Sequence, residues 1–245
     1  MISVRQLTKT LGTQTVLRGV DLDIQTGQTC VILGRSGSGK SVLLKHLIGL
    51  MQPTSGEVWV DGEDITGLPE RKLGGIRKKV GMLFQSGALF DSMNVEQNLA
   101  FPLREAGVRN EKEIRDRVAE ALEMVDLAGE QKKMPEKLSG GMRKRVGLAR
   151  TIVGRPACIL YDEPTTGLDP IATDSINHLI RRLQKRLSVT SVVVTHDMKT
   201  AFHTADRIAF LHEGRIHFLG SAAELRTSID PVIADFVEGR SGDSD

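Results

Sequence analysis

Residues 29–50 read "TCVILGRSGSGKSVLLKHLIGL". This stretch has the pattern of an apolar strand, a turn rich in glycine and serine, and an apolar helix. Residues 34–41 match G-x-x-x-x-G-K-[S/T] at every fixed position. Glycines let a backbone close around an anion, while successive N–H groups and the next helix N-terminus point at phosphate oxygens. The stretch therefore predicts a phosphate-binding loop between a strand and a helix.

Two side chains of this loop are expected to act on a nucleotide directly. Lys40 would neutralise the β and γ phosphates, and the hydroxyl of Ser41 would complete the shell of Mg²⁺. The residues expected to contact the nucleotide here are Gly34, Arg35, Ser36, Gly37, Ser38, Gly39, Lys40, Ser41 and Val42.

A second stretch, "CILYDEP" at residues 158–164, supplies carboxylates at the end of an apolar strand. Neighbouring side chains of an extended chain point in different directions. Asp162 is therefore expected to hold Mg²⁺, directly or through water, while Glu163 acts as general base on the attacking water.

Composition and patterning indicate an α/β protein. The 245 residues suffice for one large domain or two small ones. The apolar runs at 157–161 and 191–195 do not alternate with polar residues, as expected of buried parallel strands. Residues 111–127 place Ile114, Val118, Ala121, Leu122 and Val125 on one stripe of an amphipathic helix.

Charge and cysteine usage limit the partners and the compartment. The formal net charge is only +2, which argues against a nucleic-acid partner, and the basic run at 71–79 is interpreted as a solvated face. Cys30 and Cys158 lie in apolar runs and are predicted to be buried thiols in a reducing cytoplasm. Neither a signal peptide nor a run of about 20 apolar residues is visible, so we expect any membrane role to depend on a partner.

The segment "LSGGMRKRVGLAR" at 138–150, with Gln85, "GLDP" at 167–170 and "THD" at 195–197, resembles the nucleotide-binding subunit of ABC transporters. The resemblance covers about residues 2–225. It implies a P-loop NTPase (RecA-like) α/β core, an N-terminal antiparallel β subdomain and an inserted helical subdomain at about 87–156. The nucleotide-binding domain would cover 1–235, and the polar tail at 236–245 is expected to be frayed.

The same resemblance implies an ATPase that works as a head-to-tail homodimer with two sandwiched ATP molecules. Ser139 suits a helix N-cap, and Gly140 and Gly141 allow close approach of a backbone. By resemblance, these three residues would cap the γ-phosphate of ATP held by the other protomer. Asp169 would lie across the dimer interface, His196 would contact the γ-phosphate, and Gln85 would reach Mg²⁺ and the attacking water.

The sequence departs from the family pattern at two places. Met142 stands where Gln is common, which should alter only the first turn of its helix. Leu11, or Thr10 one residue earlier, stands where many relatives carry an aromatic that stacks on adenine. Because base–aromatic stacking contributes about 1–3 kcal/mol in nucleic-acid complexes, we expect weaker adenine discrimination than usual.

The segment "FQSGALFDSMNVEQNLAFPL" at 84–103 resembles the subgroup that powers MCE-type lipid transporters, including the bacterial (Mla-type) system that maintains outer-membrane lipid asymmetry. This implies a peripheral protein on the cytoplasmic side of the inner membrane that moves phospholipid or a related lipid. Its partners would be permease subunits, contacted through residues 86–103, an MCE-domain protein and possibly a STAS-domain protein.

Alternatives remain for the details and for the function. Phe84 is expected in the core, whereas Leu89, Phe90 and Phe101 suit either core packing or permease contact. Residues 231–240 would pack on the other protomer or fray. The rival functions are an ATPase of another transporter, for amino acids or lipoproteins, and a soluble ABC ATPase that remodels a protein or nucleic-acid complex.

Overall fold

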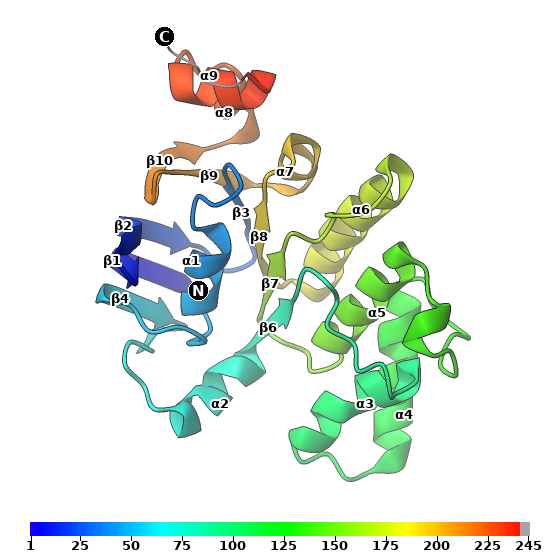
Figure 1. Cartoon of the computed structure of the whole chain (residues 1–245). Helices are drawn as coiled ribbons and strands as arrows, with labels where there is room; N and C mark the ends of the chain where they lie inside the picture. Colours follow the sequence, from blue (N-terminus) through cyan, green and yellow to red (C-terminus); the bar gives the residue numbers. More distant parts are fainter. Residues whose placement is uncertain (241–245) are drawn as a thin grey trace. The chain divides into compact units, whose positions relative to one another are not determined.

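A computed structural model of the chain describes residues 1–240 and divides into two compact units (Figure 1). The first unit comprises Met1–Leu73 and Thr190–Asp245, of which residues 241–245 lie outside the description. The second unit comprises Gly74–Val189. Among residues 1–240, no helix has the length and apolar character needed to cross a membrane.

The first unit contains an antiparallel sheet with the order β2-β1-β4-β5. Its strands are β1 (Ile2–Leu11), β2 (Gln14–Ile24), β4 (Ser55–Val60) and β5 (Glu63–Asp64). Along β2, side chains from Val20 to Ile24 alternate between buried and exposed positions, as one buried sheet face requires. The expected N-terminal antiparallel β subdomain is confirmed.

The first unit also contains strands that are buried throughout their length. β3 (Thr29–Leu33) pairs in parallel with β8 (Thr190–Thr195) and β9 (Arg207–His212), and β10 (Arg215–Gly220) is antiparallel to β9. Every residue of β3 and β8 is buried, which explains their unbroken apolar character. The helices of this unit are α1 (Lys40–His46), α7 (Met198–Thr204), α8 (Ala222–Arg226) and α9 (Pro231–Glu238).

Helix α9 changes the expected boundary at residue 235. The side chain of Asp230 accepts hydrogen bonds from the amides of Val232 and Ile233 and so caps the helix. Ile233 is buried, and the ring of Phe236 lies 4.9 Å from that of Phe210 between centroids. Residues 236–238, which were assigned to the polar tail, therefore belong to a helix that its apolar face holds against β9. The last five residues of the predicted tail, 241–245, lie outside the described residues.

The second unit is a pair of parallel strands with helices. Its strands are β6 (Val80–Leu83) and β7 (Cys158–Asp162). Its helices are α3 (Val95–Glu105), α4 (Glu111–Met124), the short 3₁₀ helix η1 (Pro135–Lys137), α5 (Gly140–Ile152) and α6 (Pro170–Leu187), and α2 (Glu70–Lys79) begins just before the boundary. Figure 1 shows α3, α4 and α5 gathered in one group, drawn in green.

Several expectations about packing are confirmed. Ile114, Val118, Ala121 and Leu122 form the buried stripe of α4. Both cysteines are free thiols in buried positions, and burial raises the pKa of each to about 12. Such thiols remain protonated at neutral pH and act as small core side chains.

Candidate functional site

The predicted phosphate loop lies between β3 and α1, and its glycines are required by its shape. A Cβ at Gly34 would lie 2.4 Å from the backbone oxygen of Leu211, so only glycine fits. Gly37 and Gly39 have φ angles of +79° and +102°, which residues with a Cβ rarely adopt. Arg35, Ser36 and Gly37 are exposed. The loop is thus a tightly turned backbone with an open edge, as phosphate binding needs.

Lys40 is the first residue of α1, and its side chain is buried. Its ammonium donates hydrogen bonds to the backbone oxygens of Gly34 and Arg35, at 3.0 and 2.9 Å. A buried charge is tolerated only when it is well bonded, and these carbonyls meet that need within the loop. The positive charge is therefore fixed where the motif predicts that a phosphate binds.

Strand pairing places His196 at the same sheet edge as the phosphate loop. β3 and β8 are parallel neighbours in which Leu33 pairs with Thr195, so the loop and His196 both leave the sheet at their carboxyl ends. His196 is exposed. Asp197 accepts hydrogen bonds from the amides of Lys199 and Thr200 and so caps α7. The first unit thus places the phosphate loop and His196, both predicted to contact the nucleotide, at one edge of its sheet.

The end of β1, at the tip of the β1–β2 hairpin, carries an aliphatic residue where an aromatic would be needed to stack on adenine. Leu11 is exposed and pairs with Gln14, and the hydroxyls of Thr10 and Thr15 lie 3.2 Å apart. Residues 2–24 contain no aromatic residue. The tip therefore offers an aliphatic side chain for contact with a base.

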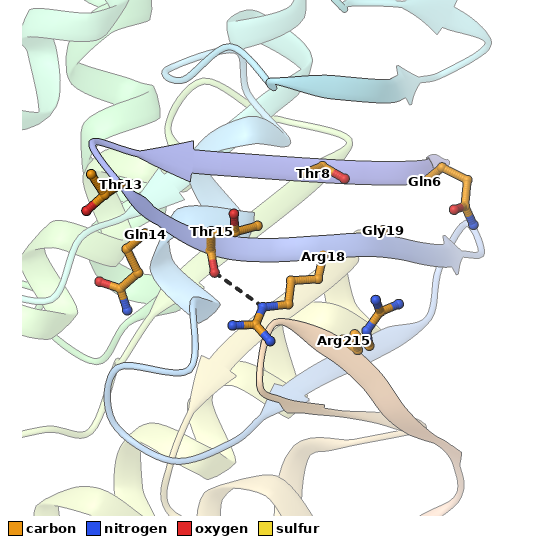
Figure 2. A pocket seen from close by; sticks show the side chains of 8 residues that line it. All are labelled: Gln6, Thr8, Thr13, Gln14, Thr15, Arg18, Gly19 and Arg215. Carbon is orange, nitrogen blue, oxygen red and sulfur yellow. Dashed lines mark hydrogen bonds between the residues drawn. The ribbon is translucent and has the colours of Figure 1, made fainter.

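The outer face of the same hairpin carries an open polar pocket of about 860 Å³ that the sequence did not reveal (Figure 2). It is lined by Gln6, Thr8, Thr13, Gln14, Thr15, Arg18, Gly19 and Arg215. Within it the Arg18 side chain donates to the backbone oxygen of Thr15 at 3.4 Å. None of the predicted nucleotide contacts lines this pocket.

In the second unit, the predicted carboxylates stand at the end of β7. Asp162 and Glu163 are both buried, and Glu163 has a left-handed φ of +48°. A residue with a side chain seldom adopts that conformation, and such strain gathers at functional sites. The hydroxyl of Thr166 donates to the Glu163 carboxylate at 3.2 Å. The Glu163 side chain is thus held in a defined direction.

Gln85 lies at the same edge of the strand pair as these carboxylates. β6 runs parallel to β7, with Leu83 paired to Tyr161, so Gln85 follows one strand as Asp162 and Glu163 end the other. Gln85 is exposed. The second unit therefore brings together the three predicted groups for Mg²⁺ and water that it contains.

Lys144 on α5 joins these two loops and was missed by the sequence reasoning. Its side chain is only 5% exposed, and its ammonium donates to the backbone oxygens of Gln85 and, at 3.3 Å, of Glu163. Burial lowers the pKa of Lys144, and the charges of Glu163 and Asp162 oppose that shift. One signal was available, because Lys144 shares a helix face with the apolar Leu148.

Two predicted site residues, Ser139 and Asp169, cap helix N-termini in the second unit. Ser139 accepts a hydrogen bond from the amide of Met142 at 3.3 Å and caps α5, while Ser139 and Gly140 are exposed. Asp169 accepts hydrogen bonds from the amides of Ile171 and Ala172 and caps α6. The capping role predicted for Ser139 is confirmed.

An apolar groove of about 680 Å³ lies beside the loop that follows Gln85. Phe84, Phe90, Phe101, Pro102 and Arg150 are among its lining residues. Phe90 and Phe101 are 43% and 38% exposed, and their rings meet edge to face at 5.0 Å. These two rings therefore belong to the surface rather than to the core, whereas Leu89 is half-buried.

The expectation that Phe84 is a core residue is wrong. Leu83 is the last residue of β6 and is buried, whereas Phe84 is 38% exposed and lines the groove. Successive side chains of an extended chain point to opposite sides. The side chain that follows the buried end of the strand therefore faces the groove.

Asn98 on α3 holds the loop that presents Phe90. Its fully buried amide accepts a hydrogen bond from the Phe90 amide at 2.9 Å. It donates to the backbone oxygens of Phe90, Met93 and Asn94, at 3.1, 2.9 and 3.1 Å. One side chain thereby satisfies the polar backbone groups of a whole turn.

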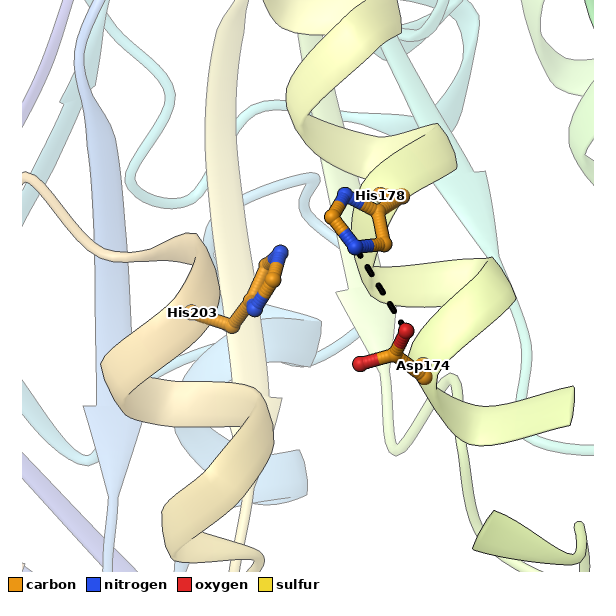
Figure 3. A group of neighbouring side chains, drawn as sticks. All are labelled: Asp174, His178 and His203. Carbon is orange, nitrogen blue, oxygen red and sulfur yellow. Dashed lines mark ion pairs between the residues drawn. The ribbon is translucent and has the colours of Figure 1, made fainter. Parts of the chain in front are cut away.

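Helix α6 carries an ion pair that stands apart from these sites. His178 and Asp174 lie one turn apart, with 3.4 Å between Nε2 and the carboxylate oxygen (Figure 3). Both side chains face solvent to a large extent, so the pair contributes little to stability.

Comparisons with known proteins agree with this geometry. The sequence pattern of the family described as "ABC transporter" matches residues 17–166. The chain is 45% identical to the probable ribonucleotide transport ATP-binding protein mkl of Mycobacterium leprae, over 98% of this chain and 69% of that protein. It is 40% identical to the intermembrane phospholipid transport system ATP-binding protein MlaF of Haemophilus influenzae, over 98% and 91%.

A solved structure supports the same assignment. The dimeric post-hydrolysis state of the ATP-binding cassette MJ0796, bound to ADP and Pi, superposes with a TM-score of 0.83 at 33% identity, over 91% of this chain and 99% of that chain. The α/β fold predicted from the sequence is confirmed.

We predict that Asn98→Ala loosens the loop at 90–94. The variant leaves buried backbone groups without partners, which lowers the free energy of unfolding by about 1–3 kcal/mol. Hydrogen exchange of the amides at 90–94 should accelerate, while exchange in α4 stays unchanged. Unaltered exchange in the loop would contradict this role of Asn98.

We predict that Leu11→Tyr strengthens ATP binding. An aromatic ring at the hairpin tip can stack on adenine, which should lower the KM for ATP about tenfold. The measurement is steady-state hydrolysis of ATP and GTP by the native chain and the variant. An unchanged KM would contradict the prediction, as would a native preference for ATP over GTP of about a hundredfold or more at subsaturating nucleotide.

Proposed function

Because the chain belongs to the ABC transporter family and is an ATPase, we propose that it powers the movement of phospholipid or a related lipid through an MCE-type envelope system. The observation that carries the proposal is the exposed apolar groove lined by Phe90 and Phe101, which lies beside the loop that follows Gln85, a residue we propose to contact Mg²⁺ and the attacking water. The similarity to MlaF, which is named for phospholipid transport, supports it across 98% of the chain.

ATP and Mg²⁺ are the cofactors of this ATPase, and we assign their ligands by motif. Ser41, Gln85 and Asp162 would hold Mg²⁺, and this donor set of a hydroxyl, an amide oxygen and a carboxylate suits a hard cation. The bound ion would offset charge on the phosphates. Lys40 would neutralise the β and γ phosphates, and Glu163, whose carboxylate Thr166 orients, would accept a proton from the attacking water.

We infer a head-to-tail homodimer as the working form. The MJ0796 cassette, at 33% identity, is a dimer in its solved structure. Ser139 and Gly140 lie exposed at the N-terminus of α5, where they can face ATP held by a second protomer. Gly141, Asp169 and His196 would complete the contacts across and around that nucleotide.

The groove would accept an apolar helix of a permease through residues 86–103. Its exposed phenylalanine pair supplies apolar area, and the guanidinium of Arg150 lies 5.7 Å from the Phe90 ring centroid. A helix laid into an apolar groove is a common recognition mode. The chain would then work at the cytoplasmic side of the inner membrane in a complex with an MCE-domain protein and possibly a STAS-domain protein.

A transporter for another cargo remains the second candidate, because the relative mkl is named for ribonucleotide transport and is 45% identical. In ABC transporters the residues that bind and hydrolyse ATP do not differ with the cargo. The identity of the partner proteins therefore distinguishes the two candidate functions. Affinity purification of the tagged chain from detergent-solubilised membranes tests it. Recovery of a multi-span permease with an MCE-domain protein is expected. A permease without an MCE-domain protein, or a purely soluble complex, would overturn the proposal.

We predict that Glu163→Gln and Lys40→Ala fail at different steps. Glu163→Gln removes the base and keeps the phosphate loop, so it should bind ATP normally, lose hydrolysis and accumulate the closed dimer. Lys40→Ala removes the buried ammonium from the loop, so ATP binding itself should weaken. Nucleotide binding, turnover and gel filtration with ATP distinguish the two. Near-normal turnover by Glu163→Gln would remove Glu163 from its role.

We predict that Phe90→Ala weakens permease association and leaves basal ATPase activity largely intact. The ring is exposed and lies in the groove, outside the motifs that act on ATP. Trp59→Ala is the matched control, because Trp59 is a partly exposed aromatic of β4 in the first unit. Co-purification and ATPase rate are measured for both variants. Loss of basal activity with intact association would contradict the proposed role of Phe90 in permease contact.

A further inference from the structure

A buried lysine of the 138–150 segment, to which the sequence assigned no role, contacts two loops of the second unit. Lys144 reaches the backbone oxygen of Gln85, after β6, and that of Glu163, after β7. We propose that Lys144 is a positioning residue for ATP hydrolysis, whose ammonium fixes these carbonyls and so directs the side chains of Gln85 and Glu163. The inference rests on the roles proposed above for those two residues.

The backbone conformation of Glu163 must be held by contacts with its surroundings. Its φ of +48° is unfavourable for a residue with a side chain, and the conformation persists only if its surroundings impose it. The Glu163 carbonyl accepts hydrogen bonds from Lys144 Nζ and, at 3.3 Å, from the amide of Thr166. The ammonium thus acts on the carbonyl of the same residue whose carboxylate Thr166 orients.

The chemistry of Lys144 suits this task. An ammonium has three donors and no acceptor, so it binds several carbonyls at once. Its charge is buried, and a buried charge is expensive unless such bonds compensate it. The bonds to Gln85 and Glu163 are therefore strongly preferred over a freely moving side chain, and the two loops are held at a fixed separation.

Two further residues on the same face of helix α5 contact the Gln85 loop. A Cβ at Gly147 would lie 3.0 Å from the backbone oxygen of Gly87, so the helix and the loop are in close contact. Arg150 donates to that same oxygen at 3.1 Å. Positions 144, 147 and 150 follow the spacing of one helix face. Lys144 differs from the other two because it also reaches Glu163.

The test measures ATP binding and turnover separately in the full chain. Lys144→Met removes the donors and keeps the length of the side chain. We expect kcat to fall about tenfold or more while the Kd for ATP changes by less than about threefold, because the phosphate loop is untouched. Lys144→Arg should regain part of the kcat, since a guanidinium also donates to two carbonyls. Lys112→Met, at an exposed lysine of α4, should match the native chain.

Substitute variants at Lys144 and a parallel measurement of Glu163→Gln complete the test. If Lys144→Met does not fold, folded Lys144→Arg and Lys144→Gln replace it, with kcat expected to fall in the order Lys, Arg, Gln at equal ATP affinity. Native kcat in these variants overturns the inference, as does a loss of ATP affinity equal to the loss of kcat. Glu163→Gln is measured in parallel. If it turns over normally, the proposed role of Glu163 fails; if it is inactive while Lys144→Met is fully active, only the inference about Lys144 fails.

Discussion

In each unit of the protein, a buried lysine ammonium binds the backbone carbonyls of a loop that follows a buried strand. Lys40 binds the oxygens of Gly34 and Arg35 after β3, and Lys144 binds those of Gln85 and Glu163 after β6 and β7. A buried charge is costly in free energy unless it is hydrogen-bonded. A change in the conformation of these loops would therefore leave an ammonium without its partners or expose it to water. The geometry of the loops proposed to bind and hydrolyse ATP depends on this constraint.

The constraint also joins chemistry to recognition within the second unit. Helix α5 begins at the exposed cap of Ser139, holds the Gln85 loop through Lys144 and Gly147, and ends near Arg150, which contacts Gly87 and the ring of Phe90. One helix therefore links the surface proposed for a second protomer, the loop of Gln85, which is proposed to reach Mg²⁺ and the attacking water, and the groove proposed for a permease. A displacement of the groove would be carried to Gln85 by direct contacts.

Much of the fold and the site could be predicted from local sequence. The positive φ angles of Gly37 and Gly39, the stripe of α4 and the cap at Ser139 each depend on residues close in the chain, so the sequence pattern predicts them. Lys144 could not be assigned because its partners lie 59 and 19 residues away. Phe84 was misassigned because one position past a strand reverses the direction of the side chain, and α9 because its contact with Phe210 joins distant segments.

We propose that ATP hydrolysis by this chain drives the movement of lipid. The most direct measurement is the ATPase rate of the intact complex, isolated from its own membranes and placed in a defined bilayer, with phospholipid, an amino acid or a ribonucleotide supplied in turn. We expect the ATPase rate to change with phospholipid alone and labelled phospholipid to move only when ATP is hydrolysed. A rate that responds to the amino acid or the ribonucleotide, with no movement of phospholipid, would contradict the proposal.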